Sequence, residues 1–236
     1  MAADPRYWAV IPAAGTGTRM EMTTPKQYLS LQGLPIMEHV LLRFCRHPAI
    51  VGIVVALAPE DHYWQTLSVA AHEKIRTTTG GEERCHSVLN GLRALPEIAD
   101  ANDWVMVHDA ARPCLRKEDM DKLIDVLSGH PVGGILAIPV RDTMKRAGKD
   151  NEIEATVDRS DLWHALTPQM FRLGLLEEAL AGAVAAERVV TDEAQALEMA
   201  GYRPLLVPGH PDNIKVTHRS DLPLAELFLS QQENGS

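Results

Sequence analysis

The chain has 236 residues, of which 45% are hydrophobic, and its formal net charge at pH 7 is −9. This length is enough to bury a sizeable core and suits one α/β domain. The acidic balance argues against a nucleic-acid or anionic-membrane partner, because no surplus of basic side chains is available to displace counterions. A nucleotide substrate is still compatible with it, since salt screens charges beyond about 8 Å and a local group of Lys and Arg matters more than the overall sum.

Cysteine and histidine usage narrows the class of protein further. Cys45, Cys85 and Cys114 are odd in number and show no C-x-x-C spacing, which argues against a disulfide framework or structural zinc site and favours reduced thiols in the cytoplasm. The ten histidines include no H-x-x-x-H pair, so transition-metal chemistry has no support in the sequence. No apolar run approaches the roughly 18 residues of a membrane helix. The first apolar run, interrupted by Pro12, is interpreted as a strand and not as a signal peptide.

Short apolar runs bounded by Gly or Pro recur along the chain, as expected for buried parallel strands. They occupy residues 8–11, 52–57, 104–107, 134–138 and 205–207. Between these runs, residues 85–92 and 120–127 place apolar side chains at the i, i+3, i+4 and i+7 positions of a helix. This alternation predicts an α/β fold with a mostly parallel, twisted sheet and helices on both faces.

No linker or repeat separates a second domain, so residues 1–236 are predicted to form one domain. A last helix is expected at residues 222–229, followed by a polar tail that frays. Residues 141–161 depart from the alternation, because they are polar and charged with Gly148 near the middle. Two β-compatible flanks around such a turn predict a projecting hairpin, and a disordered surface loop fits the pattern equally well.

The first predicted strand leads into a loop of small residues, Pro-Ala-Ala-Gly-Thr-Gly-Thr-Arg-Met at positions 12–20, and then to Lys26. Because α/β sheets bind ligands at the carboxyl ends of strands, the two glycines could let backbone N–H groups approach a phosphate chain. Arg19 and Lys26 would add positive charge there. The spacing matches neither the dinucleotide G-x-G-x-x-G nor a P-loop. A glycine turn with two solvated basic residues is the structural alternative.

A second glycine segment, Gly-Gly-Glu-Glu-Arg, occupies positions 80–84. Two glycines after a strand suggest that the backbone approaches a ligand, and Ser87 lies about one helical turn further on. The two acids could instead simply favour the start of a helix through its dipole.

Asp109 and Arg112 follow the apolar run at residues 104–107. An Asp at the carboxyl end of a strand is well placed to bind Mg²⁺ together with substrate phosphates. Arg112 could grip a phosphate through two parallel hydrogen bonds. A turn-capping role is the alternative for Asp109, and His108 is interpreted as a packed, hydrogen-bonded histidine.

Lys215 and Thr191 are two further candidates. Lys215 lies in Asp-Asn-Ile-Lys-Val-Thr at positions 212–217, after the last predicted strand, and could point back over the edge of the sheet. A solvated Lys on a short strand is the ordinary alternative. Thr191 is expected to be the N-cap of a helix, and Asp192 and Glu193 would suit the dipole of that helix.

The four segments, in this order, resemble the 2-C-methyl-D-erythritol 4-phosphate cytidylyltransferase family of non-mevalonate isoprenoid synthesis. Further matches lie at residues 139–145, 156–159 and 166–169. The resemblance covers roughly residues 8–228 and implies a Rossmann-like nucleotidyltransferase fold that forms a homodimer. In that picture, residues near 140–160 form a β-arm that clasps the partner subunit, with Thr143 and Arg159 reaching into the active site of the neighbour.

The resemblance also implies transfer of CMP from CTP to 2-C-methyl-D-erythritol 4-phosphate, giving 4-diphosphocytidyl-2-C-methyl-D-erythritol and pyrophosphate, with Mg²⁺ or another divalent cation as cofactor. The residues it implies for CTP are Ala13, Ala14, Gly15, Thr16, Gly17, Gly81, Glu82, Ser87 and Ala110. Those for the methylerythritol phosphate are Asp109, Arg112, Thr143, Arg159, Thr167, Thr191 and Lys215. In the implied roles, Arg19 and Lys26 stabilise the transition state, Arg159 and Lys215 position the substrate, and Asp109 holds the metal.

The sequence departs from the family pattern at two places and leaves alternatives open. Thr18 stands where the family often has a second basic residue, and Glu82 where some relatives carry Asp. A cytidylyltransferase for another polyol phosphate, such as ribitol 5-phosphate, would share the nucleotide loop. A sugar-1-phosphate nucleotidyltransferase using UTP or dTTP and a non-catalytic CTP-sensing module are the remaining alternatives.

Overall fold

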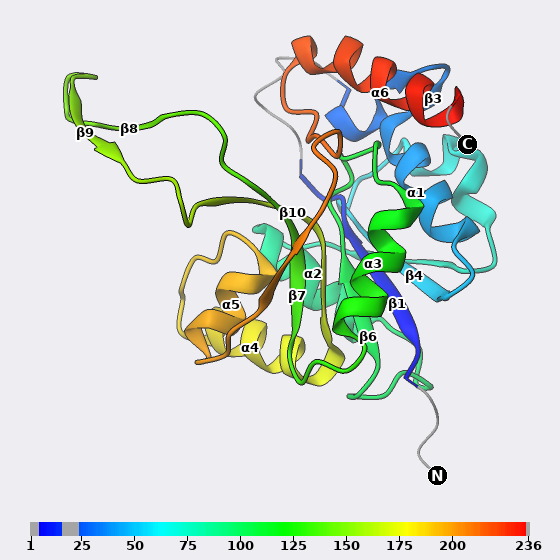
Figure 1. Ribbon diagram of the computed structural model, residues 1–236. Coiled ribbons are helices and arrows are strands. Elements are labelled where there is room, and N and C mark those ends of the chain that lie inside the picture. Colours follow the sequence, from blue (N-terminus) through cyan, green and yellow to red (C-terminus); the bar gives the residue numbers. More distant parts are fainter. Residues whose placement is uncertain (1–4, 16–23, 235–236) are drawn as a thin grey trace.

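A seven-stranded sheet forms the centre of the computed structural model, which describes residues 5–15 and 24–234 (Figure 1). Its strands lie in the order β11-β7-β10-β6-β1-β4-β5, with the bounds β1 (Tyr7–Pro12), β4 (Ile50–Leu57), β5 (Ile75–Thr79), β6 (Trp104–Val107), β7 (Gly133–Pro139), β10 (Trp163–Arg172) and β11 (Leu205–Pro208). β10 runs antiparallel to β6 and β7, and the other pairings within this sheet are parallel. The α/β class and the mostly parallel sheet are confirmed.

Besides β5, whose residues are mostly polar, β10 is the strand of this sheet that the apolar runs do not indicate. The polar residues His164, Thr167 and Gln169 interrupt its apolar run. Thr167 and Gln169 are nevertheless buried, because the Thr167 hydroxyl bonds His108 and the Gln169 amide bonds Asp192. This strand is therefore polar where it connects the sheet to neighbouring elements.

Helices cover both faces of the sheet (Figure 1). One face packs against α1 (Ile36–Arg46) and α3 (Lys117–Leu127), and the other against α2 (Arg84–Arg93), α4 (Leu173–Ala185) and α5 (Glu193–Met199). The alternation of side chains along β1 serves both layers, since Ala9 and Ile11 join the first core and Trp8 and Val10 the second.

Helix α2 lies close to β1 because Gly91 has no side chain. A Cβ atom added to Gly91 would lie 2.5 Å from Cγ1 of Val10, closer than packed atoms tolerate. The predicted apolar face of this helix is buried and consists of Cys85, Val88, Leu89 and Leu92. Burial of each Val or Leu side chain contributes about 1.5–3 kcal/mol. The packing fixes the first residues of α2 near the carboxyl end of β1.

A third, smaller core joins α6 (Leu222–Asn234) to the strand pair β2 (Ser30–Leu31) and β3 (Leu34–Pro35). The expectation that a polar tail frays after residue 229 was wrong, because the helix continues to Asn234. Gln232 holds this last turn: its Nε2 donates to the Cys114 carbonyl at 2.9 Å, and its Oε1 accepts from Arg43 Nη2 at 2.9 Å. Short 3-10 helices occupy η2 (Lys26–Tyr28), η3 (Trp64–Thr66), η4 (Ser68–Ala71) and η5 (Arg219–Asp221).

A two-stranded hairpin projects from the body, as the left side of Figure 1 shows. It consists of β8 (Met144–Ala147) and β9 (Ile153–Val157), which pair antiparallel. The turn is closed by a hydrogen bond from the Gly148 N–H to the Glu152 carbonyl at 2.8 Å. Of the two interpretations of residues 141–161, the hairpin is confirmed. Among the described residues, no helix is long and apolar enough to cross a membrane.

Candidate active site

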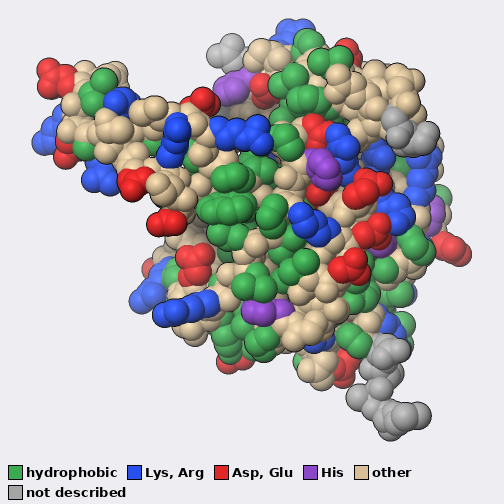
Figure 2. Space-filling model, viewed as in Figure 1, with side chains coloured by type: hydrophobic (Ala, Val, Ile, Leu, Met, Phe, Trp, Pro, Cys, Tyr) green, Lys and Arg blue, Asp and Glu red, His purple; other side chains and the backbone are tan. Residues whose placement is uncertain are grey.

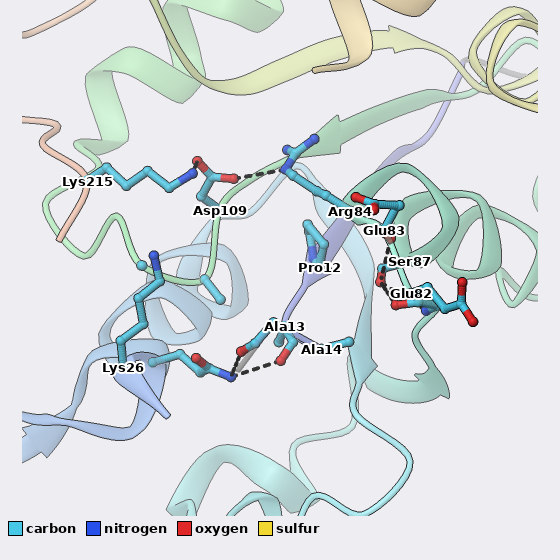
Figure 3. A pocket seen from close by; sticks show the side chains of 15 residues that line it. Pro12, Ala13, Ala14, Lys26, Glu82, Glu83, Arg84, Ser87, Asp109 and Lys215 are labelled. Atoms are coloured by element: carbon cyan, nitrogen blue, oxygen red, sulfur yellow. Dashed lines mark hydrogen bonds and ion pairs between the residues drawn. The ribbon is translucent and has the colours of Figure 1, made fainter. Parts of the chain in front are cut away.

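A pocket opens at the carboxyl ends of the parallel strands β1, β5 and β6 (Figure 3). It is lined by Pro12, Ala13, Ala14, Gly15, Lys26, Gln27, Gly81, Glu82, Glu83, Arg84, Ser87, Asp109, Ala110, Ala111 and Lys215. This is the edge at which α/β sheets bind ligands. Segments that lie far apart in the sequence thus meet at the place where the sequence predicts a nucleotide.

The start of the small-residue loop is held by Gln27, whose role the sequence analysis missed. Its buried amide Nε2 donates to the carbonyl oxygens of Ala13 at 2.9 Å and Gly15 at 3.2 Å. The Ala13 N–H donates to the Ala56 carbonyl at 2.8 Å. These bonds tie the loop to η2, so that Lys26 comes to line the same pocket.

The rest of this loop lies in residues 16–23, which are outside the described part of the chain. Four residues singled out from the sequence fall there: Thr16, Gly17, Thr18 and Arg19.

The second glycine segment packs directly against the first loop. A Cβ atom on Gly80 would lie 2.3 Å from Cβ of Ala14 and 2.9 Å from Oγ of Ser87, so only glycine allows this approach. The Gly81 N–H donates to Ser87 Oγ at 3.1 Å. Glu83 is the N-cap of α2 and forms a capping box with His86. The wall of the pocket is therefore built by a helix start and two closely packed loops.

Asp109 lies at the centre of a cluster of cations (Figure 3). Its Oδ1 accepts from Arg84 Nε at 3.2 Å, and its Oδ2 contacts Arg112 Nε at 3.2 Å and Lys215 Nζ at 2.9 Å. Burial alone would raise the pKa of Asp109, but Arg84, Lys215 and Arg112 hold this pKa well below its usual range. Asp109 is therefore charged, and it gathers three basic side chains at the pocket.

Lys215 reaches Asp109 from the segment after β11. The expected alternative of a solvated lysine on a short strand is wrong, because residues 212–217 form no strand. Hydrogen bonds hold the segment instead: the Asn213 carbonyl accepts from Arg112 Nη1 at 2.8 Å, and the Val216 N–H donates to the Ala111 carbonyl at 2.8 Å. Lys215 does point back over the edge of the sheet.

His108 organises this end of β6 from within. The Arg112 carbonyl can only accept, so His108 Nε2 donates to it at 3.0 Å, and Nδ1 accepts from the Thr167 hydroxyl at 2.9 Å. Oγ1 of Thr167 in turn accepts from the Asp109 N–H at 3.2 Å. The interpretation of His108 as a packed, hydrogen-bonded histidine is confirmed, and its bonds orient Thr167 and the turn that carries Arg112.

Burial lowers the pKa of His108 to about 4, which gives the stability of the protein a defined pH dependence. The unfolded chain binds this proton at higher pH, so the free energy of unfolding falls as the pH drops from about 6.5 to about 4. The expected slope from this group is at most about 1.4 kcal/mol per pH unit. Urea unfolding across this range measures it. His108→Asn should flatten the slope; a slope as steep as that of the wild type in this variant would contradict the assignment.

The model of the IspD family, described as 2-C-methyl-D-erythritol 4-phosphate cytidylyltransferase, matches residues 7–231. The chain belongs to the IspD family.

Its relatives include the 2-C-methyl-D-erythritol 4-phosphate cytidylyltransferase of Pseudomonas putida (strain GB-1), 53% identical over 219 residues that cover 92% of this chain and 93% of the relative. That of Vibrio vulnificus (strain CMCP6) is 52% identical over 226 residues, covering 96% and 95%. The crystal structure of a 4-diphosphocytidyl-2C-methyl-D-erythritol synthase superposes with a TM-score of 0.84 at 41% identity, covering 97% of this chain and 100% of that one. The Francisella tularensis 2-C-methyl-D-erythritol 4-phosphate cytidylyltransferase gives a TM-score of 0.81 at 36% identity, covering 94% and 99%. The family and fold implied by the sequence motifs are confirmed.

Most residues that the IspD resemblance assigns to CTP lie together in this structure. Seven of them line the pocket: Ala13, Ala14, Gly15, Gly81, Glu82, Ser87 and Ala110. Asp109, Lys26 and Lys215 line it as well, and Arg112 and Thr167 are joined to Asp109 by hydrogen bonds. The small-residue loop and the cation cluster around Asp109 therefore belong to one site.

Thr191 lies apart from this group. The expectation that Thr191 caps the helix was wrong by one residue, because the N-cap of α5 is Asp192, whose carboxylate accepts from the Gln195 N–H at 2.9 Å. The Thr191 hydroxyl is exposed and donates to the Gln195 side chain at 3.1 Å. Asp192 is favoured at the cap because Gln169 Nε2 also donates to its carboxylate, at 2.9 Å. Thr191 does not line the pocket of its own subunit.

Thr143 and Arg159 belong to the projecting arm and its base. Both are exposed and neither lines the pocket of the same subunit. Arg159 donates to the carbonyl of Arg141 at the base of the arm.

Arg84 and Glu193 form the ion pair that the sequence analysis missed. Both Nη atoms of Arg84 donate to the carboxylate of Glu193, which is fully buried at the start of α5. Burial raises the pKa of Glu193, while Glu193 and Asp109 together outweigh burial and raise the pKa of Arg84. Nothing in the local pattern pairs two residues that are 109 positions apart.

Proposed function

We propose that this chain transfers CMP from CTP to 2-C-methyl-D-erythritol 4-phosphate, forming 4-diphosphocytidyl-2-C-methyl-D-erythritol and releasing pyrophosphate. The observation that carries this proposal is the joint position of Lys26, Lys215 and Asp109 in one pocket with the small-residue loop, in a member of the IspD family. A polyanionic substrate requires such local compensation inside a chain with a net charge of −9.

The chemical difficulty of the reaction is electrostatic. The second ionisation of a phosphate monoester lies near pH 6, so the methylerythritol phosphate is already a nucleophile at neutral pH and needs no general base. One of its oxygens attacks the α-phosphorus of CTP, and the bond from that phosphorus to the bridging oxygen of pyrophosphate breaks. Two anions must approach each other and a third must leave. Catalysis therefore depends on alignment and on cations placed where charge accumulates.

The pocket supplies both requirements from its own side chains. Lys26 stands beside the small-residue loop, whose backbone N–H groups can approach the triphosphate. Lys215 and Arg112 each contact the carboxylate of Asp109, and in this position they can bind the phosphate of the second substrate. The rigid bonding of Thr167, His108 and Asp109 holds these donors in place before substrate arrives.

Asp109 is the residue proposed to hold Mg²⁺. Among the described residues, no group of three or more His, Cys, Asp or Glu could hold a metal ion by itself. Mg²⁺ commonly uses one or two carboxylates together with substrate phosphates and water, which a single buried Asp fits. Because three cations already surround Asp109, we expect a divalent ion to bind here together with the triphosphate and not before it. When bound, Mg²⁺ would neutralise part of the triphosphate charge.

Pyrophosphate release by the purified chain tests the proposal. We expect release from CTP with 2-C-methyl-D-erythritol 4-phosphate and none with CTP alone. Parallel reactions with ribitol 5-phosphate, and with UTP or dTTP and a sugar 1-phosphate, measure the alternatives. Faster pyrophosphate release with ribitol 5-phosphate would show that ribitol 5-phosphate is the preferred acceptor. CTP binding without any turnover would favour the non-catalytic CTP-sensing module.

We further infer that two copies of the chain form a homodimer through the arm. No described residue of the hairpin lines the pocket of its own subunit, yet the hairpin carries exposed apolar side chains, Ile153 at 68% and Met144 at 37%. Figure 2 shows hydrophobic side chains gathered on the body below the arm. A partner subunit would cover these groups and bring Thr143 and Arg159 to the neighbouring pocket.

Mixing two inactive variants tests this exchange. Arg159→Ala disables the arm and Lys26→Ala disables the pocket, so each variant alone is expected to be nearly inactive. If arms serve the partner, a mixed dimer has one pocket with both residues intact, and a random 1:1 mixture recovers about a quarter of the wild-type activity. Recovery should require subunit exchange, and a mixture as inactive as its components would contradict the shared site.

A further inference from the structure

We propose that Glu193 is a positioning residue for the transfer reaction and acts through Arg84 on Asp109. The proposal rests on the proposed function. Glu193 does not line the pocket, whereas Arg84 and Asp109 do. The three residues come from the start of α5, the start of α2 and the end of β6, so their contacts join three separate elements at the site.

The hydrogen bonds of Arg84 set the orientation of its guanidinium group. Nη1 and Nη2 donate to the two carboxylate oxygens of Glu193, and the Nη2 bond measures 3.1 Å. Nε donates to Asp109 Oδ1 at 3.2 Å. A two-pronged pair of this kind fixes the plane of the guanidinium as well as its distance. Through these bonds, Glu193 orients Arg84 so that the Nε edge of its guanidinium faces Asp109.

The buried position of Glu193 needs an explanation beyond the helix dipole. An acid in the first turn gains from the dipole while it is exposed to solvent, whereas burying a carboxylate is costly unless it is paired. Glu193 has 0% of its surface exposed. Its place is fixed by Gln169, which bonds Asp192 and the Ala194 N–H, each at 2.9 Å. The fold therefore holds this one carboxylate in a fixed, buried position.

The charge of Glu193 has a direct consequence for bound phosphates. It neutralises Arg84, so the guanidinium stays on Asp109 when a triphosphate enters the pocket. Without the carboxylate, Arg84 would share the single negative charge of Asp109 with Arg112 and Lys215, and it would move toward the polyanion. Asp109 would then lose the partner of its Oδ1, and its carboxylate would rotate. Lys215, which contacts Oδ2 of the same carboxylate, would lose its position. The chemical step should slow without weakening of CTP binding.

Glu193→Gln tests this role, because it keeps the shape of the side chain and removes its charge. We expect kcat to fall about tenfold or more, while calorimetry with CTP and Mg²⁺ gives a Kd equal to or tighter than wild type. Glu177→Gln is the matched control: it removes the carboxylate of a surface pair with Arg93, 3.4 Å apart, and should leave kcat and Kd unchanged. Thermal unfolding of each variant gives the folded fraction to which kcat is referred.

A second pair of variants separates positioning from a loss of stability. If Glu193 acts through Arg84, the double variant Arg84→Gln with Glu193→Gln should have the same kcat as Arg84→Gln alone. This comparison still decides the matter if Glu193→Gln alone does not fold. A kcat of Glu193→Gln within tenfold of wild type, CTP binding that weakens together with kcat, or additive losses in the double variant would overturn the proposal. Absence of turnover in the wild-type chain would instead overturn the proposed function.

Discussion

Replacing Lys26 by alanine is expected to lower kcat for pyrophosphate release about 10²–10³-fold while the protein stays folded. Lys26 is the first residue of η2 and lines the pocket beside the small-residue loop. Figure 3 places its amine on the same side of the pocket as that of Lys215. In this position the Lys26 amine can stabilise the negative charge that develops as pyrophosphate leaves. Steady-state kinetics with both substrates measure the effect, and Arg19→Ala, outside the described residues, is expected to fall in the same range.

The control for this variant is Lys117→Ala. Lys117 is the first residue of α3, is not among the residues that line the pocket, and pairs with Asp121 on the surface. A surface pair of this kind contributes about 0–1 kcal/mol, so stability and kcat should stay close to wild type. If Lys26→Ala turned over CTP within a few-fold of wild type, the assigned role of Lys26 would be wrong.

Asp109→Asn is expected to lower both activity and stability. The substitution keeps the shape of the side chain but leaves Arg84, Arg112 and Lys215 without their common anion. Removing one partner from a buried ion pair typically destabilises a protein by about 3–5 kcal/mol. We expect kcat to fall by about 10² or more, since the cations separate and lose their alignment. Urea unfolding and steady-state kinetics measure the two effects.

Metal-free CTP binding distinguishes this explanation from simple misfolding. The unopposed cations of the Asp109→Asn variant should bind CTP more tightly than wild type when Mg²⁺ is absent, and CTP should restore more of the lost stability. Asp121→Asn, which removes a partly exposed carboxylate outside the pocket lining, is the control. An Asp109→Asn protein with wild-type stability and kcat would contradict the central position given to Asp109.

Much of the fold follows from local pattern. Strands β1, β4, β6, β7 and β11 are apolar runs, and α2 and α3 show apolar positions at helical spacing. β5 and β10 are not apolar runs, and in β10 the polar residues Thr167 and Gln169 form hydrogen bonds to other elements. The order of α6 beyond residue 229 depends on Gln232 contacts with Cys114 and Arg43, which are distant in the sequence.

The candidate site divides in the same way. Residues that directly follow a strand, such as Ala13 and Asp109, could be predicted because strand ends meet at one edge of a parallel sheet. Partners that come together only through tertiary packing could not be predicted. The pair of Arg84 and Glu193 and the hydrogen bonds of Gln27 are of this kind. Glu193 in particular is an acidic residue in the first turn of a helix, and the helix dipole alone is enough to explain an acidic residue there.

A crystal structure of the chain with CTP and Mg²⁺ tests the central claim most directly. The claim is that basic side chains converge at the edge of the sheet to neutralise two phosphorylated substrates. We predict the triphosphate in the pocket between Lys26 and the Asp109 cluster, with the amine of Lys26 within hydrogen-bonding distance of a phosphate oxygen and Arg19 joining it from the small-residue loop. A triphosphate bound elsewhere, or Lys26, Arg19 and Lys215 spread over separate surfaces, would contradict the account.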